Sequence, residues 1–256
     1  MSYAGLSPHE IQARMDARYA TETAYPLTLP WDIARMEELA EVTLRLVGDV
    51  KGARVLDIAC GTGGLAAEMA ARQAAEHVGI DLSPEAIRQA REGHRHLSTV
   101  RFEVMDAQHL AFPDSSFHRV IAREALEHMP DARQVCSEIA RVLVPGGRLV
   151  LTSPNRDSLH LRMARALGHP EFLCSMDHIR ELTYGECCDV LSATGFRIVE
   201  TAGVFLMPYW GIPGVDGPVR TLTDRDAETI ALFRDLGRRV GPEYAFCYVI
   251  AAETHQ

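Results

Sequence analysis

The sequence has no apolar run of the roughly 18 to 20 residues that a membrane-spanning helix needs. Its first residues, Met1-Ser2-Tyr3-Ala4, lack the basic-then-apolar form of a secretory signal peptide. No internal repeat or low-complexity segment is present. We therefore expect a cytoplasmic protein that does not enter a membrane, in which 47% hydrophobic residues over 256 positions supply one full core.

Paired cysteines and an excess of basic residues are also missing. The six cysteines show no C-x-x-C spacing, so neither a disulfide framework nor a zinc knuckle is indicated, and reduced thiols are expected. Lys and Arg number 26 against 35 Asp and Glu, which gives a formal net charge of −9. A net negative chain is poorly suited to a long polyanion, so nucleic acid is disfavoured as a partner.

Short apolar segments alternate with helical patterns after residue 53. The expected strands are 54–59, 77–81, 99–105, 117–122 and 148–152, and the expected helices between them are 63–73, 84–93, 123–128 and 131–142. Such alternation is typical of a doubly wound, mostly parallel α/β sheet that binds ligands at the carboxyl ends of its strands. Two late β-rich stretches, 196–200 and 244–251, have no crossover helix pattern close to either, which suggests an antiparallel hairpin that completes a seven-stranded Rossmann-like sheet.

The same pattern divides the chain into four parts. Residues 1–50 hold two predicted helices, 8–19 and 31–46, which either cover a sheet edge or form part of a cap or lid. The cofactor-binding core is expected at 51–155, an inserted lid segment at 156–182, and the C-terminal part of the sheet at 183–256. The last part contains a long connection, 204–243.

A glycine turn follows the first strand, in Val55-Leu56-Asp57-Ile58-Ala59-Cys60-Gly61-Thr62-Gly63-Gly64. Glycines there let the backbone pass close to a ligand, and the N–H groups of the next helix point at it. Asp81 ends the second strand, where a carboxylate can accept hydrogen bonds from both hydroxyls of a ribose. These features fit a nucleotide-type cofactor, and by themselves they do not separate NAD from S-adenosylmethionine.

Two further carboxylates separate these cofactors. Asp57, before the glycine turn, would repel a pyrophosphate but suits a ligand with an ammonium group and a sulfonium charge. Asp106 follows the third strand, where it can accept from an adenine amino group. A helix cap or a solvated strand end is the alternative role for Asp57 or Asp81 taken alone.

With these residues the chain resembles the class I S-adenosylmethionine-dependent methyltransferases. Five ordered blocks over residues 53–155 carry the resemblance: V-L-D-I-A-C-G-T-G-G, V-G-I-D-L-S, M-D-A, F-H-R-V-I-A and L-V-P-G-G-R-L-V-L. It implies S-adenosylmethionine as the cofactor. The implied contacts are Asp57, Gly61 and Gly63 to the methionine portion, Asp81 to the ribose, and Asp106 with Ala107 to the adenine, with Ala59, Leu82 and Arg123 as further cofactor-binding residues.

The segment after the fourth strand contains Glu124, Glu127 and His128, which would share one face of a helix at i, i+3 and i+4. This E-x-x-E-H spacing is similar to the divalent-metal site of ubiquinone-type O-methyltransferases and small-RNA 2′-O-methyltransferases. Asp177-His178 resembles the segment that supplies a fourth ligand in the RNA enzymes. The resemblance implies Mg²⁺ or another divalent metal on Glu124, Glu127, His128 and His178; a general base at His128 or His178, or a structural role, are the alternatives.

We therefore expect a methyltransferase that acts on a small, aromatic-containing molecule, at oxygen in the first instance. N- or C-methylation, RNA 2′-O-methylation, an NAD-dependent oxidoreductase and a binding protein that no longer methylates are kept as alternatives. A homodimer is also an open expectation. Aromatic residues could line an apolar acceptor pocket or form a subdomain core: Tyr19, Tyr25, Trp31, Phe205, Tyr209 and Trp210.

Overall fold

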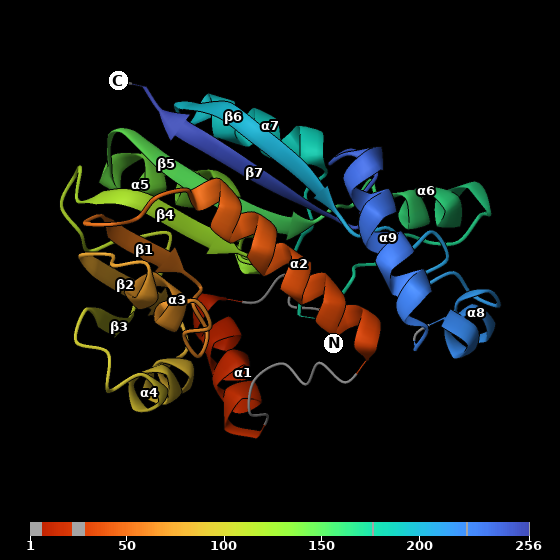
Figure 1. The fold of residues 1–256 in the computed structure, drawn as a ribbon, viewed down its shortest axis with the longest axis horizontal. Coiled ribbons are helices and arrows are strands. Elements are labelled where there is room, and N and C mark those ends of the chain that lie inside the picture. The colour runs from red at the N-terminus through yellow and green to blue at the C-terminus, as the bar shows by residue number, and fades with distance from the viewer. Residues whose placement is uncertain (1–6, 22–28, 176, 224, 256) are drawn as a thin grey trace.

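The computed structural model describes residues 7–21, 29–175, 177–223 and 225–255 (Figure 1). Seven strands form one sheet in the order β3-β2-β1-β4-β5-β7-β6. The first five in that order pair in parallel, and β7 runs antiparallel to both β5 and β6. The strands are β1 (Arg54–Ile58), β2 (Glu76–Asp81), β3 (Val100–Val104), β4 (Phe117–Arg123), β5 (Leu143–Pro154), β6 (Phe196–Val204) and β7 (Cys247–Thr254). The predicted fold class, including the C-terminal antiparallel strands, is confirmed.

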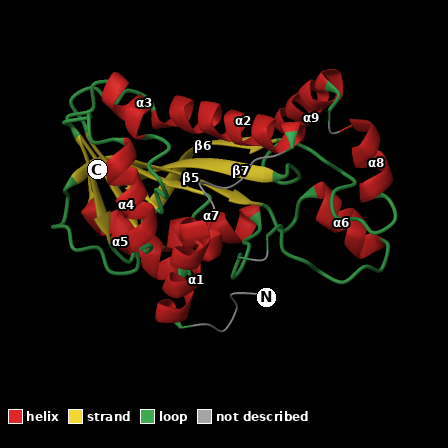
Figure 2. Cartoon of the chain, turned by 90° about the horizontal axis from the view of Figure 1, so that it is seen from below, coloured by secondary structure: helices red, strands yellow, loops and turns green. Residues whose placement is uncertain are grey.

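Helices lie on both faces of the sheet. They are α1 (Pro8–Thr21), α2 (Pro30–Val47), α3 (Ala66–Ala71), α4 (Pro84–Gly93), α5 (Ala132–Val142), α6 (Leu159–Ala166), α7 (Tyr184–Ala193), α8 (Asp216–Thr223) and α9 (Ala227–Val240). Figure 2 shows α2, α3 and α9 on one side of the sheet, with α5 and α7 on the other. Among the described residues, we find no helix with both the length and the apolar character needed to cross a membrane.

Successive side chains of the central strands point to opposite faces of the sheet, so a hydrophobic core forms on each face. In β4, Val120 packs with the side chains of α5 and α7, whereas its neighbour Ile121 packs with those of α2, α3 and α9. Both side chains are fully buried, as expected for a parallel sheet covered on both faces. The sheet is therefore a rigid support, and its carboxyl-terminal edge is left to carry polar side chains.

Side-chain caps determine where several of these helices begin. Ser83 accepts a hydrogen bond from the backbone N–H of Ala86 at the start of α4, and Asp131 accepts one from Gln134 at the start of α5. At α7, Thr183 and Glu186 form a reciprocal capping box. Each cap satisfies backbone N–H groups that have no partner inside the helix.

The predicted helix over residues 123–128 is wrong. Strand β4 continues through Arg123, and the backbone N–H of Glu124 still donates to the Thr152 carbonyl of β5 at 3.1 Å. Glu124 then has a positive φ of 50°, which changes the direction of the chain. A single 3-10 turn follows, η1 (Leu126–His128). Pairing with the neighbouring strand therefore prevails over the helical spacing of the acidic residues.

The expectation of no helix near the late strands is also wrong, because α8 and α9 both lie within the connection 204–243. Helix α9 packs closely on β6 through Gly237: a Cβ added there would lie 2.3 Å from the backbone nitrogen of Phe205. Glycine in a helix usually lowers helix propensity, which obscured this helix in the sequence.

We expect Gly237→Ala to lower the free energy of unfolding by about 1 to 3 kcal/mol, because the added methyl group meets backbone that cannot move aside. Urea denaturation measures this change. Gly93→Ala in α4 is the matched control, since a Cβ there meets nothing within 4 Å. Equal stability of the two variants would contradict the close packing of α9 on β6.

Candidate functional site

Two cavities meet at the carboxyl ends of β1, β2 and β4. The larger, about 410 Å³ in volume, is called the wide arm, and the other the narrow arm. Both arms share five lining residues, from α1, the strand ends and the η1 turn, namely Ile11, Met15, Ala59, Asp81 and His128. We therefore treat them as one two-armed site, in the place where a doubly wound sheet binds its ligand.

Asp81 lies at the junction of the arms. Its Oδ2 accepts the backbone N–H of Gly61 at 2.9 Å, and its Oδ1 accepts that of Ser83 at 2.9 Å. The side chain is only 2% exposed, and burial raises the pKa of its carboxyl group above the usual value despite these hydrogen bonds. Asp81 is thus no solvated strand end: it links the glycine turn to the end of β2.

The narrow arm contains the residues predicted for the ribose and adenine. Leu82, Asp106 and Ala107 line it, together with Gln108 and Met129, which the sequence did not indicate. The Asp106 Oδ1 accepts the backbone N–H of Gln108 at 2.9 Å, which turns the chain around the carboxylate. A mostly apolar lining with a few polar groups is typical of small-molecule and cofactor sites.

Four other predicted cofactor residues do not line either arm. The Asp57 carboxylate is buried, and its Oδ2 lies 3.6 Å from His77 Nε2. Gly61 lies under the Tyr19 hydroxyl, and Gly63 packs against Phe102 and His94, while the Arg123 guanidinium lies against Gly64. Direct contact of Asp57, Gly61, Gly63 or Arg123 with a cofactor stays a prediction.

Glu127, His128 and His178 come together where the arms meet the η1 turn. One ligand atom of each lies within 4.8 Å of the others, and the two imidazole centroids are 4.9 Å apart. Glu124 is not part of this group: its Oε2 accepts from Arg35 at 3.2 Å and its Oε1 from Thr152 Oγ1 at 3.1 Å. The structure thus brings together three of the four residues predicted for a metal.

Burial controls the charges in this cluster. Glu127 is 1% exposed, and burial, with Glu124 nearby, raises the pKa of its carboxyl group well above the usual value. Its Oε2 accepts from Ser153 Oγ at 3.0 Å, whereas its Oε1 has no partner among the described residues. Burial, and then the neighbouring His178, lower the pKa of the His128 imidazole. A neutral imidazole beside an unsatisfied carboxylate oxygen is a competent acceptor for a proton or a cation.

Aromatic rings form one wall of the wide arm. Trp31, Trp210 and Phe246 line it, with Phe246 centred 6.2 Å from Trp31 and 5.3 Å from Trp210. Of the other predicted pocket aromatics, Tyr19 lines the arm, whereas Phe205 and Tyr209 belong to the core instead. Tyr25 lies outside the described residues.

Helix α1 covers both arms. Its Ile11, Met15 and Tyr19, spaced at i, i+4 and i+8, face the site, and this spacing was the signal available in the sequence. Arg18 forms an ion pair with Asp177, beside the histidine cluster. On the other side, the Asp16 carboxylate accepts from the Ser83 hydroxyl at 2.5 Å. The helix therefore connects both sides of the site.

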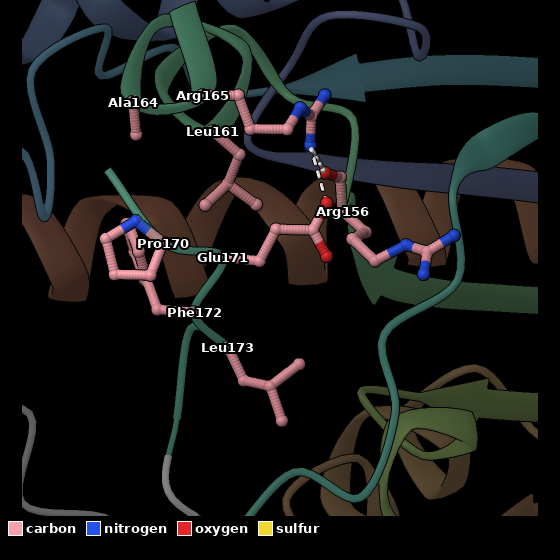
Figure 3. Close-up of a pocket in the computed structure, with 8 residues that line it drawn as sticks. All are labelled: Arg156, Leu161, Ala164, Arg165, Pro170, Glu171, Phe172 and Leu173. Carbon is pink, nitrogen blue, oxygen red and sulfur yellow. Dashed lines mark hydrogen bonds and ion pairs between the residues drawn. The ribbon is translucent and has the colours of Figure 1, made fainter. Parts of the chain in front are cut away.

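A separate hollow of about 100 Å³ lies beside α6. Figure 3 shows its lining, in which Arg165 faces Glu171 at 3.9 Å and also donates to the backbone carbonyl of Arg156 at 3.2 Å. None of the residues predicted for cofactor, base or metal lines it. The two-armed site is therefore the candidate functional site.

The sheet order defines the class of fold: a Rossmann-like α/β protein, with the two-armed site at the carboxyl ends of its strands. Residues 49–195, more than half of the chain, match the family described as a methyltransferase domain. The O-methyltransferase rstn1 of Aspergillus nomiae is 32% identical over 185 residues, which are 66% of this chain and 79% of that protein. The chain belongs to this methyltransferase family, and its fold is that of the class I S-adenosylmethionine-dependent methyltransferases.

Other similar proteins match different shares of the chain. A ubiquinone biosynthesis O-methyltransferase of Xanthomonas oryzae pv. oryzae is 43% identical over 110 residues, which are 42% of this chain and 46% of that protein. The chain thus spans about half the length of this relative. Among solved structures, the [4+2]-cyclase SpnF has a TM-score of 0.67 at 21% identity and covers 100% of this chain and 99% of its own. This likeness shows the shared fold.

His160 is a buried histidine whose titration should affect stability. Its ring stacks on Phe246 with centroids 4.9 Å apart, and burial lowers the pKa of its imidazole to about 3 from the usual 6.5. Between these two pKa values the His160 imidazole is protonated in the unfolded chain but not in the folded protein. The free energy of unfolding therefore falls as the pH decreases below 6.5, with a slope that approaches about 1.4 kcal/mol per pH unit. His160→Phe should make stability between pH 6 and about 4.5 less dependent on pH by roughly this slope.

Urea denaturation at several pH values measures the slope. The exposed His96, changed to Phe, serves as the control and should leave the parent slope unchanged. If the His160→Phe curve runs parallel to that of the parent, the imidazole is not held neutral in the folded state.

Proposed function

We propose that this protein transfers a methyl group from S-adenosylmethionine to an oxygen atom of a small, aromatic-containing molecule. The observation that supports this best is the lining of the site: the wide arm brings together Asp81, the two histidines His128 and His178, and an aromatic wall. When bound, the cofactor supplies a methyl group already activated by its sulfonium charge. The protein must then align the acceptor and remove its proton.

A histidine of the cluster is suited to that proton. The His128 Nδ1 lies 3.1 Å from the backbone carbonyl of Asp177, and a carbonyl can only accept, so Nδ1 carries the hydrogen. Its Nε2 is left as the basic atom, and the lowered pKa keeps it unprotonated near neutral pH. We propose that Nε2 of His128, or of His178, takes the acceptor's hydroxyl proton as the methyl–oxygen bond forms and the methyl–sulfur bond breaks.

A divalent cation is proposed at the same cluster. The residues fit such an ion, because Glu127 Oε1 is a buried carboxylate oxygen without a partner among the described residues, beside two imidazoles. Glu127, His128 and His178 would hold it, whereas Glu124 is engaged by Arg35. A bound cation would supply Lewis acidity that lowers the pKa of a coordinated hydroxyl.

The aromatic-walled arm and the net charge of −9 favour a small molecule over nucleic acid as the acceptor. The four-part division of the chain is proposed with α1 as the cap, since it covers both arms. Cys174, Ser175, Asp177 and His178 are proposed as part of the lid. A homodimer and a cytoplasmic location stay predictions.

Asp81→Asn should weaken S-adenosylmethionine binding by about tenfold or more, because charge-assisted hydrogen bonds contribute about 1.5 to 3 kcal/mol. Isothermal titration calorimetry measures the affinity, and circular dichroism confirms the fold. Asp114→Asn, at a carboxylate 76% exposed, is the matched control. Affinity equal to that of the parent would rule out Asp81 as the ribose-binding carboxylate.

Glu127→Gln should lower Mn²⁺ affinity by at least about tenfold, because it replaces a charged ligand oxygen with a neutral amide. Calorimetry with Mn²⁺ alone measures this, with Glu92→Gln, at a side chain 69% exposed, as the control. A chelator should also inhibit methyl transfer by the parent. If the parent neither binds Mn²⁺ nor responds to the chelator, the metal proposal is wrong and the imidazole base stands alone.

A further inference from the structure

The segment between α6 and α7 contains His178 and contacts Nδ1 of both imidazoles of the cluster. The Asp177 carbonyl accepts from Nδ1 of His128, as described above, and the backbone N–H of Ile179 donates to the Glu127 carbonyl at 2.8 Å. This segment therefore packs directly on the η1 turn. Its own buried carboxylate is Glu181, which is 0% exposed and has no part in the function proposed so far.

Glu181 lies against the other imidazole. Its Oε1 is 2.6 Å from His178 Nδ1, a short distance for a hydrogen bond between nitrogen and oxygen. The same Oε1 accepts the backbone N–H of Cys174 at 2.5 Å. A backbone N–H can only donate, so Oε1 accepts there. With Glu181 as a carboxylate, whose oxygens only accept, the hydrogen between Oε1 and His178 lies on Nδ1.

We infer that Glu181 is the positioning residue of His178: it holds the imidazole as the Nδ1–H tautomer and so presents the Nε2 lone pair to the cluster. The partner of one ring nitrogen determines which nitrogen carries the proton. Carboxylates commonly play this part behind histidines that bind cations or take protons. With the Asp177 carbonyl behind His128, both imidazoles present Nε2.

The expected His178 tautomer is the same whether Nε2 binds a cation or takes a proton. Whether Nε2 binds a cation or takes a proton rests on the proposed function, but the protonation of Nδ1 follows from Glu181 alone. If Glu181 only anchored the Cys174 backbone, it would not determine which nitrogen of His178 carries the proton. The two roles therefore differ in a spectroscopic signature.

The experiment is NMR of the full-length protein labelled with ¹⁵N histidine, using two-bond ¹H–¹⁵N correlations at pH 8. In the parent, His178 should show a protonated Nδ1 and an unprotonated Nε2. Glu181→Gln should preserve this pattern, because an amide oxygen can still accept from Nδ1. Glu181→Leu should shift His178 to the Nε2–H form and lower Mn²⁺ affinity by about 10- to 100-fold. Glu186→Gln, at the nearby α7 capping box, is the control and should leave His178 unchanged.

The parent spectrum alone can overturn the inference: a His178 protonated on Nε2 contradicts it even if Glu181→Leu does not fold. An unchanged Nδ1–H tautomer in folded Glu181→Leu would contradict it too. If the parent shows the expected tautomer but binds no Mn²⁺, the metal proposal fails and the role of Glu181 stands. Failure of the inference and failure of the proposed function are thus separable.

Discussion

The site depends on one buried carboxylate. Asp81 accepts the N–H of Gly61 from the glycine turn and that of Ser83 from the start of α4, so the ends of β1 and β2 are held in one geometry. Burial makes this charge costly, since water is excluded while Asp57 and Asp16 lie nearby. A ligand that donates hydroxyl hydrogens to Asp81 relieves that cost, which explains why a ribose suits this position better than an anionic group.

The histidine cluster of the site is assembled from distant segments. The η1 turn supplies Glu127 and His128, and the segment before α7 supplies His178. These are joined through backbone contacts such as that from Ile179 to the Glu127 carbonyl, whereas Arg18 of α1 pairs with Asp177 on the open side. The position of α1 and the placement of the histidines are therefore linked through one short segment.

Much of this could be predicted from the sequence, because strand periodicity and glycine chemistry are local. The positions of the strands along the chain, the glycine turn and the position of Asp81 at a strand end follow from such patterns. Glu124 could not be placed, since its backbone pairs with Thr152 and its carboxylate with Arg35, both remote in sequence. The proximity of the Asp57 carboxylate to His77 could not be predicted for the same reason, because His77 lies on the neighbouring strand. Helix α9 escaped prediction because Gly237 serves packing rather than helix propensity.

The central claim is that the two arms hold the two halves of a methyl transfer: the adenosine in the narrow arm, and the acceptor in the wide arm next to the histidines. A crystal structure with S-adenosylhomocysteine tests it most directly. We predict the ribose hydroxyls within hydrogen-bond distance of Asp81, the adenine beside Asp106 and Ala107, and the sulfur open toward His128 and the aromatic wall. Adenosine bound elsewhere, or a sulfur turned away from the wide arm, would contradict the account.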